Sequence, residues 1–114
     1  MKYENGKLDR VFTALANKYR RDIVYRLSLQ PSSIAYLAHE IKLSLPAIHK
    51  HIRVLEKAQL LQRRKSGRSN FLALNRKGLI VHLKWAEQFN VQWGSDKESL
   101  ENYIQRIERE NSRK

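Results

Sequence analysis

Apolar residues recur at helical spacing through the first thirty residues of the chain. Positions 8, 11, 12 and 15 form one stripe and positions 23, 24 and 27 form the next, which predicts two helices. Pro31 ends the second helix because a proline ring cannot continue one. Residues 1–7, with a predicted turn at Asn5-Gly6, are expected to form a flexible arm.

A third and a fourth helical stripe follow, separated by a very short turn. Residues 34–41 carry apolar side chains at i, i+3, i+4 and i+7, which is typical of a helix packed on a core. Ser44 is a favourable N-cap for the next helix, and Pro46 suits its first turn because the missing N–H would be unpaired there anyway. This fourth helix is predicted to end near residue 58, so the two helices form a helix-turn-helix.

After the fourth helix the sequence pattern changes to short strands. Residues 60–65 and 70–74 are predicted as two strands around a turn at residues 66–69. A hairpin directly after a helix-turn-helix is typical of a winged helix. The predicted fold is therefore mainly α with a small β-hairpin, a winged helix-turn-helix over residues 8–94.

The end of the chain returns to helical spacing. Ser95 and Glu98 have the form of a capping box that opens a final helix within residues 95–114. The first and last helices carry more apolar surface than one winged helix needs, so we expect a two-fold dimer through them. The alternative is that the last helix folds back on its own domain. The expected dimerisation residues are Leu8, Val11, Phe12, Trp93, Leu100, Tyr103, Ile104 and Ile107.

The positive charge of the chain is concentrated in its middle third. The formal net charge is +12, and residues 41–86 hold eleven Lys and Arg against a single acid, Glu56. A merely solvated surface would mix both signs. The localisation indicates a footprint for the phosphates of double-stranded DNA.

The predicted fourth helix has an apolar face and an opposite face of cationic and hydrogen-bonding side chains. An α-helix fits the major groove of B-DNA with its N-terminal residues at the base edges. We therefore expect base contacts from the start of this helix and phosphate contacts further along it. The DNA-binding residues expected on the helix are Ser44, Leu45, Pro46, His49, Lys50, Arg53 and Lys57, of which Arg53 and Lys57 would hold phosphates.

The hairpin carries cations around Gly67 that can follow the DNA backbone or enter the minor groove. The alternative is that charge on edge strands prevents pairing with other chains. That alternative explains one or two Lys more easily than four cations without an acid. The residues expected to bind DNA from the wing are Arg63, Arg64, Lys65, Arg68 and Ser69.

Three segments together resemble the ArsR family of winged-helix regulators. Residues 36–61 resemble its helix-turn-helix signature, residues 15–23 its opening and residues 67–71 its wing. The resemblance implies a homodimeric, sequence-specific transcriptional regulator, a repressor, on a near-palindromic operator. Lys42 and Gln59 depart from the pattern, since glycine is usual at both places. Both are expected to be tight positions with positive φ.

Metal sensing is not expected, although many members of the family sense metals. The sequence has no Cys, and residues 33–36, where the family places a Cys pair, contain no ligand. His82 has no partner ligand in the later helix, because Ile80 and Trp93 occupy the matching places. No cofactor is expected, and the sequence indicates no effector.

Other functional classes fit the sequence less well. No glycine-rich phosphate loop, paired carboxylates or nucleophile–base pair indicates an enzyme. No apolar run is long enough to cross a membrane and the N-terminus does not resemble a signal peptide, so a soluble cytoplasmic protein is expected. The remaining alternatives are a winged helix used for protein contacts and a non-specific architectural DNA binder. A protein-contact module should show apolar anchors on the exposed helix face, where this chain has His49, Lys50 and Arg53.

Overall fold

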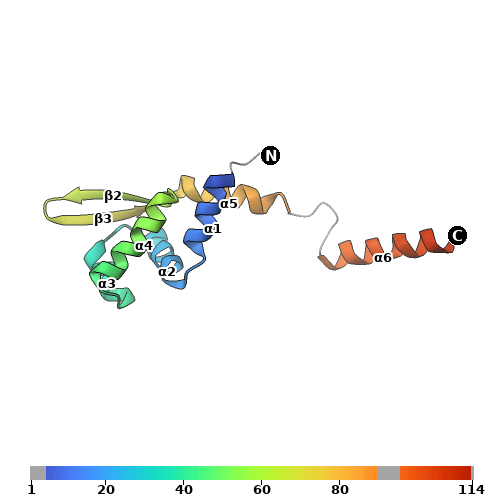
Figure 1. The fold of residues 1–114 in the computed structure, drawn as a ribbon, viewed down its shortest axis with the longest axis horizontal. Helices are drawn as coiled ribbons and strands as arrows, with labels where there is room; N and C mark the ends of the chain where they lie inside the picture. Colours follow the sequence, from blue (N-terminus) through green and yellow to red (C-terminus); the bar gives the residue numbers. More distant parts are fainter. Residues whose placement is uncertain (1–4, 90–95, 114) are drawn as a thin grey trace.

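A group of helices lies beside one end of a small sheet, and two long strands of that sheet project beyond the helices as a wing (Figure 1). The computed structural model describes residues 5–89 and 96–113. The structure confirms a mainly α fold with a helix-turn-helix followed by a hairpin. The elements in chain order are α1 (Asn5–Leu15), α2 (Lys18–Leu29), β1 (Ser32–Ser33), α3 (Ile34–Ile41), α4 (Leu45–Lys57), β2 (Leu61–Ser66), β3 (Ser69–Leu74), α5 (Arg76–Glu87) and α6 (Asp96–Ser112).

The sheet has three antiparallel strands in the order β1-β3-β2. The hairpin register runs from Leu61 opposite Leu74 to Ser66 opposite Ser69, so the turn is tighter than the four residues expected. Gly67 has φ of 60°, the left-handed conformation that a two-residue turn requires. The short strand β1 was not predicted, because two serines carry no alternating pattern.

One hydrophobic core joins the helices to the sheet. Ile48, Ile52 and Leu55 of α4 are fully buried, which confirms the apolar face predicted for that helix. They pack with buried residues of α2, α3 and the wing strands. Because these three residues hold one side of α4 against the core, the side chains on the opposite side of the helix face outward.

The N-terminal helix differs from its prediction in two ways. Helix α1 begins at Asn5, so residues 5–7, expected in the flexible arm, are helical. Leu8 lies in the first turn of α1 and is only 6% exposed. Val11 is 1% exposed, so the expected dimer role of Leu8 and Val11 is wrong. The burial of both residues within their own chain leaves them no surface for a partner.

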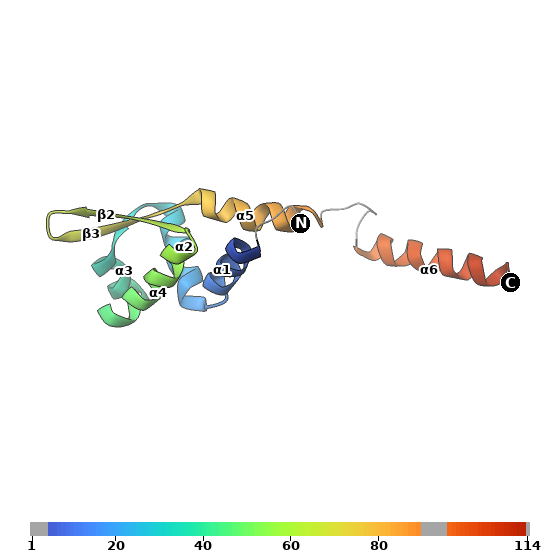
Figure 2. The ribbon, with the colours of Figure 1, turned by 45° about the horizontal axis from the view of Figure 1, so that its top comes forward.

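Helix α6 lies apart from the winged-helix domain, beyond the end of α5 (Figures 1 and 2). The molecule is accordingly elongated, with extents of 76 × 28 × 21 Å. The helix is not folded back on its own domain, which was the alternative to a dimer. Leu100, Tyr103 and Ile104 are 61%, 47% and 41% exposed. Trp93 and the N-cap Ser95 of the predicted capping box lie outside the described residues.

Both positions where this chain lacks the family's glycine have positive φ, as expected. Lys42 has φ of 63° at the end of α3, and Gln59 has φ of 60° just after α4. The Leu60 N–H then donates to the Leu55 carbonyl at 3.0 Å, which closes the end of α4. Each non-glycine residue in this conformation costs roughly 1 kcal/mol. Helix α4 is therefore flanked on both sides by a strained residue.

Replacing Gln59 by Gly is expected to stabilise the fold by up to about 1 kcal/mol, because glycine adopts positive φ without a steric cost. The midpoint of urea unfolding should rise. The matched control is Gln62→Gly, which places glycine on the exposed strand β2 and should lower the midpoint. A midpoint that falls for Gln59→Gly as it does for the control would contradict the strain at this turn.

Candidate nucleic-acid interface

The first turn of α4 lies at the surface of the molecule. The Ser44 Oγ accepts a hydrogen bond from the Ala47 N–H at 3.3 Å, which confirms Ser44 as the N-cap. Leu45 is 52% exposed, and Pro46 also lies on the surface. The positive end of the helix dipole adds to the attraction for phosphate at this position.

The exposed face of α4 gathers most of the residues predicted to bind DNA from the helix. Lys50 and Arg53 are exposed and His49 is half-buried, so the three follow Leu45 and Pro46 along one surface. Lys57 is exposed at the other end of α4, roughly 18 Å from Leu45 at 1.5 Å per residue. It lines a separate cavity with α1 and α5.

Arg20 of α2 joins α4 to the end of α1. Its Nε donates to the Ala14 carbonyl at 2.7 Å, and its Nη1 donates to His51 Nδ1 at 3.2 Å. Burial lowers the pKa of His51, and the neighbouring Arg20 and Lys50 charges lower it further. A lower pKa favours the neutral imidazole, which can accept this bond. His51 is therefore a half-buried, hydrogen-bonded residue that links α4 to α2.

The base of the wing is tied to α4 by an ion pair. Arg63 of β2 donates from Nη2 and Nε to the two carboxylate oxygens of Glu56, at 2.8 and 3.2 Å. Such a two-pronged pair fixes orientation as well as adding energy. Arg63, which was expected to bind DNA from the wing, therefore also connects α4 to the wing. The sequence marked Glu56 only as the single acid within residues 41–86 and did not predict this ion pair.

The outer part of the wing presents the other predicted cations. Arg64, Lys65 and Arg68 are exposed, as is Ser69. Successive side chains of a strand point to opposite faces, so Arg64 and Lys65 lie on different faces of the hairpin. The wing therefore offers positive charge on both sides of its tip.

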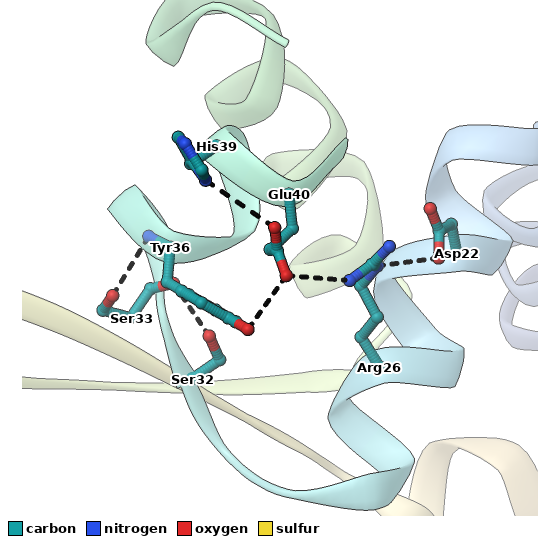
Figure 3. A network of polar contacts seen from close by, with 7 residues as sticks. All are labelled: Asp22, Arg26, Ser32, Ser33, Tyr36, His39 and Glu40. Carbon is teal, nitrogen blue, oxygen red and sulfur yellow. Dashed lines mark hydrogen bonds and ion pairs between the residues drawn. The ribbon is translucent and has the colours of Figure 1, made fainter. Parts of the chain in front are cut away.

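A polar network holds the first helix of the helix-turn-helix against α2 (Figure 3). The Tyr36 hydroxyl donates to Glu40 Oε1 at 2.9 Å, and Arg26 lies 4.0 Å from the same oxygen. Arg26 also donates to Asp22 at 3.0 Å. The hydrogen bond to Glu40 raises the pKa of Tyr36, so the hydroxyl stays protonated as the donor. The sequence did not predict this network, because its two ordinary i, i+4 pairs are joined only where α2 and α3 meet in the fold.

Gly78 of α5 is a second residue that sequence analysis missed. A Cβ at this position would lie 2.2 Å from the Gln59 carbonyl oxygen and 2.8 Å from its carbon. Only glycine lets α5 approach the backbone that follows α4 so closely. Gly78 therefore determines how closely the start of α5 packs against the end of α4.

Comparison with known proteins gives relatives for both the sequence and the fold. A family model described as bacterial regulatory protein, arsR family, matches residues 17–63. The HTH-type transcriptional regulator Rv2034 of Mycobacterium tuberculosis is 37% identical over 73 residues, which cover 64% of this chain and 68% of that protein. The crystal structure of an ArsR family transcriptional regulator is 32% identical with a TM-score of 0.71, and the match covers 77% of this chain and 92% of that one. The chain belongs to the ArsR family.

This ArsR-family protein is a transcriptional regulator with a winged helix-turn-helix DNA-binding domain. A third relative is the solution structure of a homodimeric winged helix-turn-helix domain from Mycobacterium bovis, a possible ArsR-family regulator. It is 20% identical with a TM-score of 0.60, and the match covers 75% of this chain and 83% of that one. At this level of identity the likeness confirms the fold.

Across residues 5–89 and 99–113, no group of three or more His, Cys, Asp or Glu side chains is placed to hold a metal ion. Within the same ranges, none of the helices combines the length and the apolar character that crossing a bilayer demands. The cationic face of α4 and the wing remains the main candidate interface.

Proposed function

We propose that this regulator is a homodimeric repressor that binds a near-palindromic DNA operator through α4 and the wing. The observation that carries the proposal is the exposed face of α4, where a capped helix start leads directly to cationic side chains. Leu45, Pro46, His49 and Lys50 would contact base edges in the major groove, and Arg53 would hold a phosphate. Arg64, Lys65 and Arg68 would follow the backbone beside it.

The exposed apolar surface outside the DNA-binding face supports a dimer. The stripe of Leu100, Tyr103 and Ile104 on α6 is uncovered. Phe12 of α1 packs edge-on against Trp85 of α5 at 5.0 Å, and Phe12 itself is 36% exposed. The homodimeric relative from Mycobacterium bovis shares this fold. Exposed apolar patches of this kind mark interaction surfaces.

A two-fold dimer accounts for the proposed operator and for repression. Two recognition helices enter successive major grooves about one turn of DNA apart, so the sequence that they prefer has two-fold symmetry. A dimer bound across a promoter excludes polymerase. Since the operator lies on the chromosome, the proposed place of action is the cytoplasm.

Replacing both His49 and Lys50 by Ala is expected to relax sequence preference. Each lost base contact should reduce discrimination against the wrong base by roughly 1–3 kcal/mol. Binding to random DNA should change little. Selection of bound fragments from a random library measures the preference of the wild type and of the variant.

The control for this prediction is Arg64→Ala on the wing. It should weaken binding to all sequences and reduce the slope of log K against log salt by about one unit, while the preferred sequence stays the same. An unchanged sequence preference in the His49/Lys50 variant would rule out base contacts by this pair. If the wild type selects no preferred sequence at all, the non-specific architectural binder is the better description.

A further inference from the structure

A cavity of about 270 Å³ lies where α1, the end of α4 and the start of α5 meet. Basic side chains from all three helices line it, and no acidic side chain of the described residues does so. Val11, Ala58 and Val81 supply its apolar wall. The basic residues are Lys7 and Arg10 of α1, Lys57 of α4 and Lys77 of α5, and the amides of Gln59 and Asn75 stand beside them.

Three of the four basic side chains that line this cavity have no carboxylate partner in the described part of the chain. The side chains of Arg10, Lys57 and Lys77 form no ion pair within residues 5–89 and 99–113. Elsewhere in the same ranges, Arg26 and Arg63 each face a carboxylate. Cations gathered in one hollow repel each other, and the partly apolar wall strengthens that repulsion. A bound anion would relieve it.

The start of α5 also points positive charge at the cavity. Asn75 caps the helix by accepting from the Lys77 N–H at 3.3 Å, and Asn75, Lys77 and Gly78 all line the hollow. The N-terminal end of a helix carries a partial positive charge. Because Gly78 has no side chain, α5 sits directly against the Gln59 backbone at the rim. The backbone and the side chains therefore favour the same sign of ligand.

We propose that this cavity binds a small anion carrying more than one phosphate group. Three cations without a carboxylate partner match a multivalent anion better than a single carboxylate. The volume lies just below the range of small-molecule sites, about 300–1,000 Å³, so the ligand is small. Lys57 lies at the opposite end of α4 from Leu45, so the cavity is separate from the first turn of α4 that is proposed to contact bases.

The site connects α1 and α5 to the end of the recognition helix. A ligand held there contacts elements near the proposed dimer surface and α4 at the same time, so it can act as an effector. That regulatory meaning rests on the proposed function. Anion binding itself does not, because it is measured without DNA.

Calorimetric titration of the full chain with inorganic pyrophosphate at constant ionic strength tests the site. The variant Arg10→Ala with Lys77→Ala removes two cavity cations, and Arg64→Ala with Lys65→Ala removes the same charge from the wing. We expect the cavity variant to lose at least about tenfold in affinity, since each charge-assisted contact is worth that much. The wing variant should stay within about twofold of the wild type, because it keeps every cavity contact. Equal losses in both variants, no loss in the cavity variant, or no saturable binding by the wild type would overturn the proposal.

A second measurement, of DNA binding, shows whether the cavity holds a free anion or a phosphate of the DNA backbone. Binding to random DNA is measured without pyrophosphate across a range of salt concentrations for the same two variants. If the cavity holds a free anion, only the wing variant loses salt dependence, by about two units for two contacts. An equal loss in the cavity variant would show that these cations hold the DNA backbone, which overturns the proposal of a small ligand. Failure to find an operator leaves the titration result unaffected.

Discussion

Replacing Gly78 by Ala is expected to destabilise the fold by about 2–3 kcal/mol. The new Cβ would meet the Gln59 carbonyl oxygen at 2.2 Å, and the obstacle is backbone, which cannot rotate away as a side chain can. Alanine gains about 1 kcal/mol in helix propensity over glycine, but the clash outweighs that gain. Thermal unfolding followed by circular dichroism should show a midpoint lowered by roughly 10–20 °C.

Gly6→Ala is the matched control for this experiment. Gly6 lies in the first turn of α1, where a Cβ would meet only the end of the Arg10 side chain at 3.6 Å. The same substitution should therefore stabilise the fold slightly, by less than about 1 kcal/mol. An unfolding midpoint for Gly78→Ala at or above that of the wild type would mean that α5 does not approach α4 so closely.

Placing Glu at both Leu100 and Ile104 is expected to separate the proposed dimer. Two carboxylates on the apolar stripe of α6 are costly to bury, whereas glutamate keeps the helix propensity of the segment. The mass from light scattering should fall from about twice the single-chain value to 13.5 kDa. Operator affinity should fall by roughly 10²–10⁴, because the second half-site no longer binds at a high effective concentration.

Asn102→Glu with Gln105→Glu controls for the added charge. These positions lie on the opposite side of α6 from the apolar stripe. They should leave both the mass and the affinity close to those of the wild type. If the variant with Glu at positions 100 and 104 keeps the mass of two chains, the dimer interface must lie on α1 and α5 instead. If the wild type itself has a mass of 13.5 kDa, the proposed dimer is ruled out.

The features that the sequence predicted well depend on local periodicity. The buried and exposed faces of α4 follow from the spacing of Ile48, Ile52 and Leu55, since each helical position fixes the direction of its side chain. The positive φ of Lys42 and Gln59 was expected because a resemblance showed glycine at those places. Ser44 identified the start of α4 through its side-chain chemistry alone.

The features that the sequence did not predict depend on contacts between different segments of the chain. The Glu56–Arg63 ion pair forms because β2 turns back along α4, and no spacing rule relates the two residues across a turn. Gly78 had no distinguishing mark in a helical sequence, because its role comes from the backbone of Gln59. Leu8 and Val11 were placed on a dimer surface because an apolar stripe does not show what covers it.

Strand β1 couples the movement of the wing to that of the helix-turn-helix. Ser32 and Ser33 pair with Leu72 and Phe71 of β3, and Ser33 also caps α3, so the helix-turn-helix and the wing share one sheet. Tilting the wing alone would break this backbone pairing, so the helix-turn-helix and the wing of one chain move as one rigid body. In the proposed dimer, a signal would then act by rotating one subunit relative to the other, which would change the spacing between the half-sites that the two recognition helices can span.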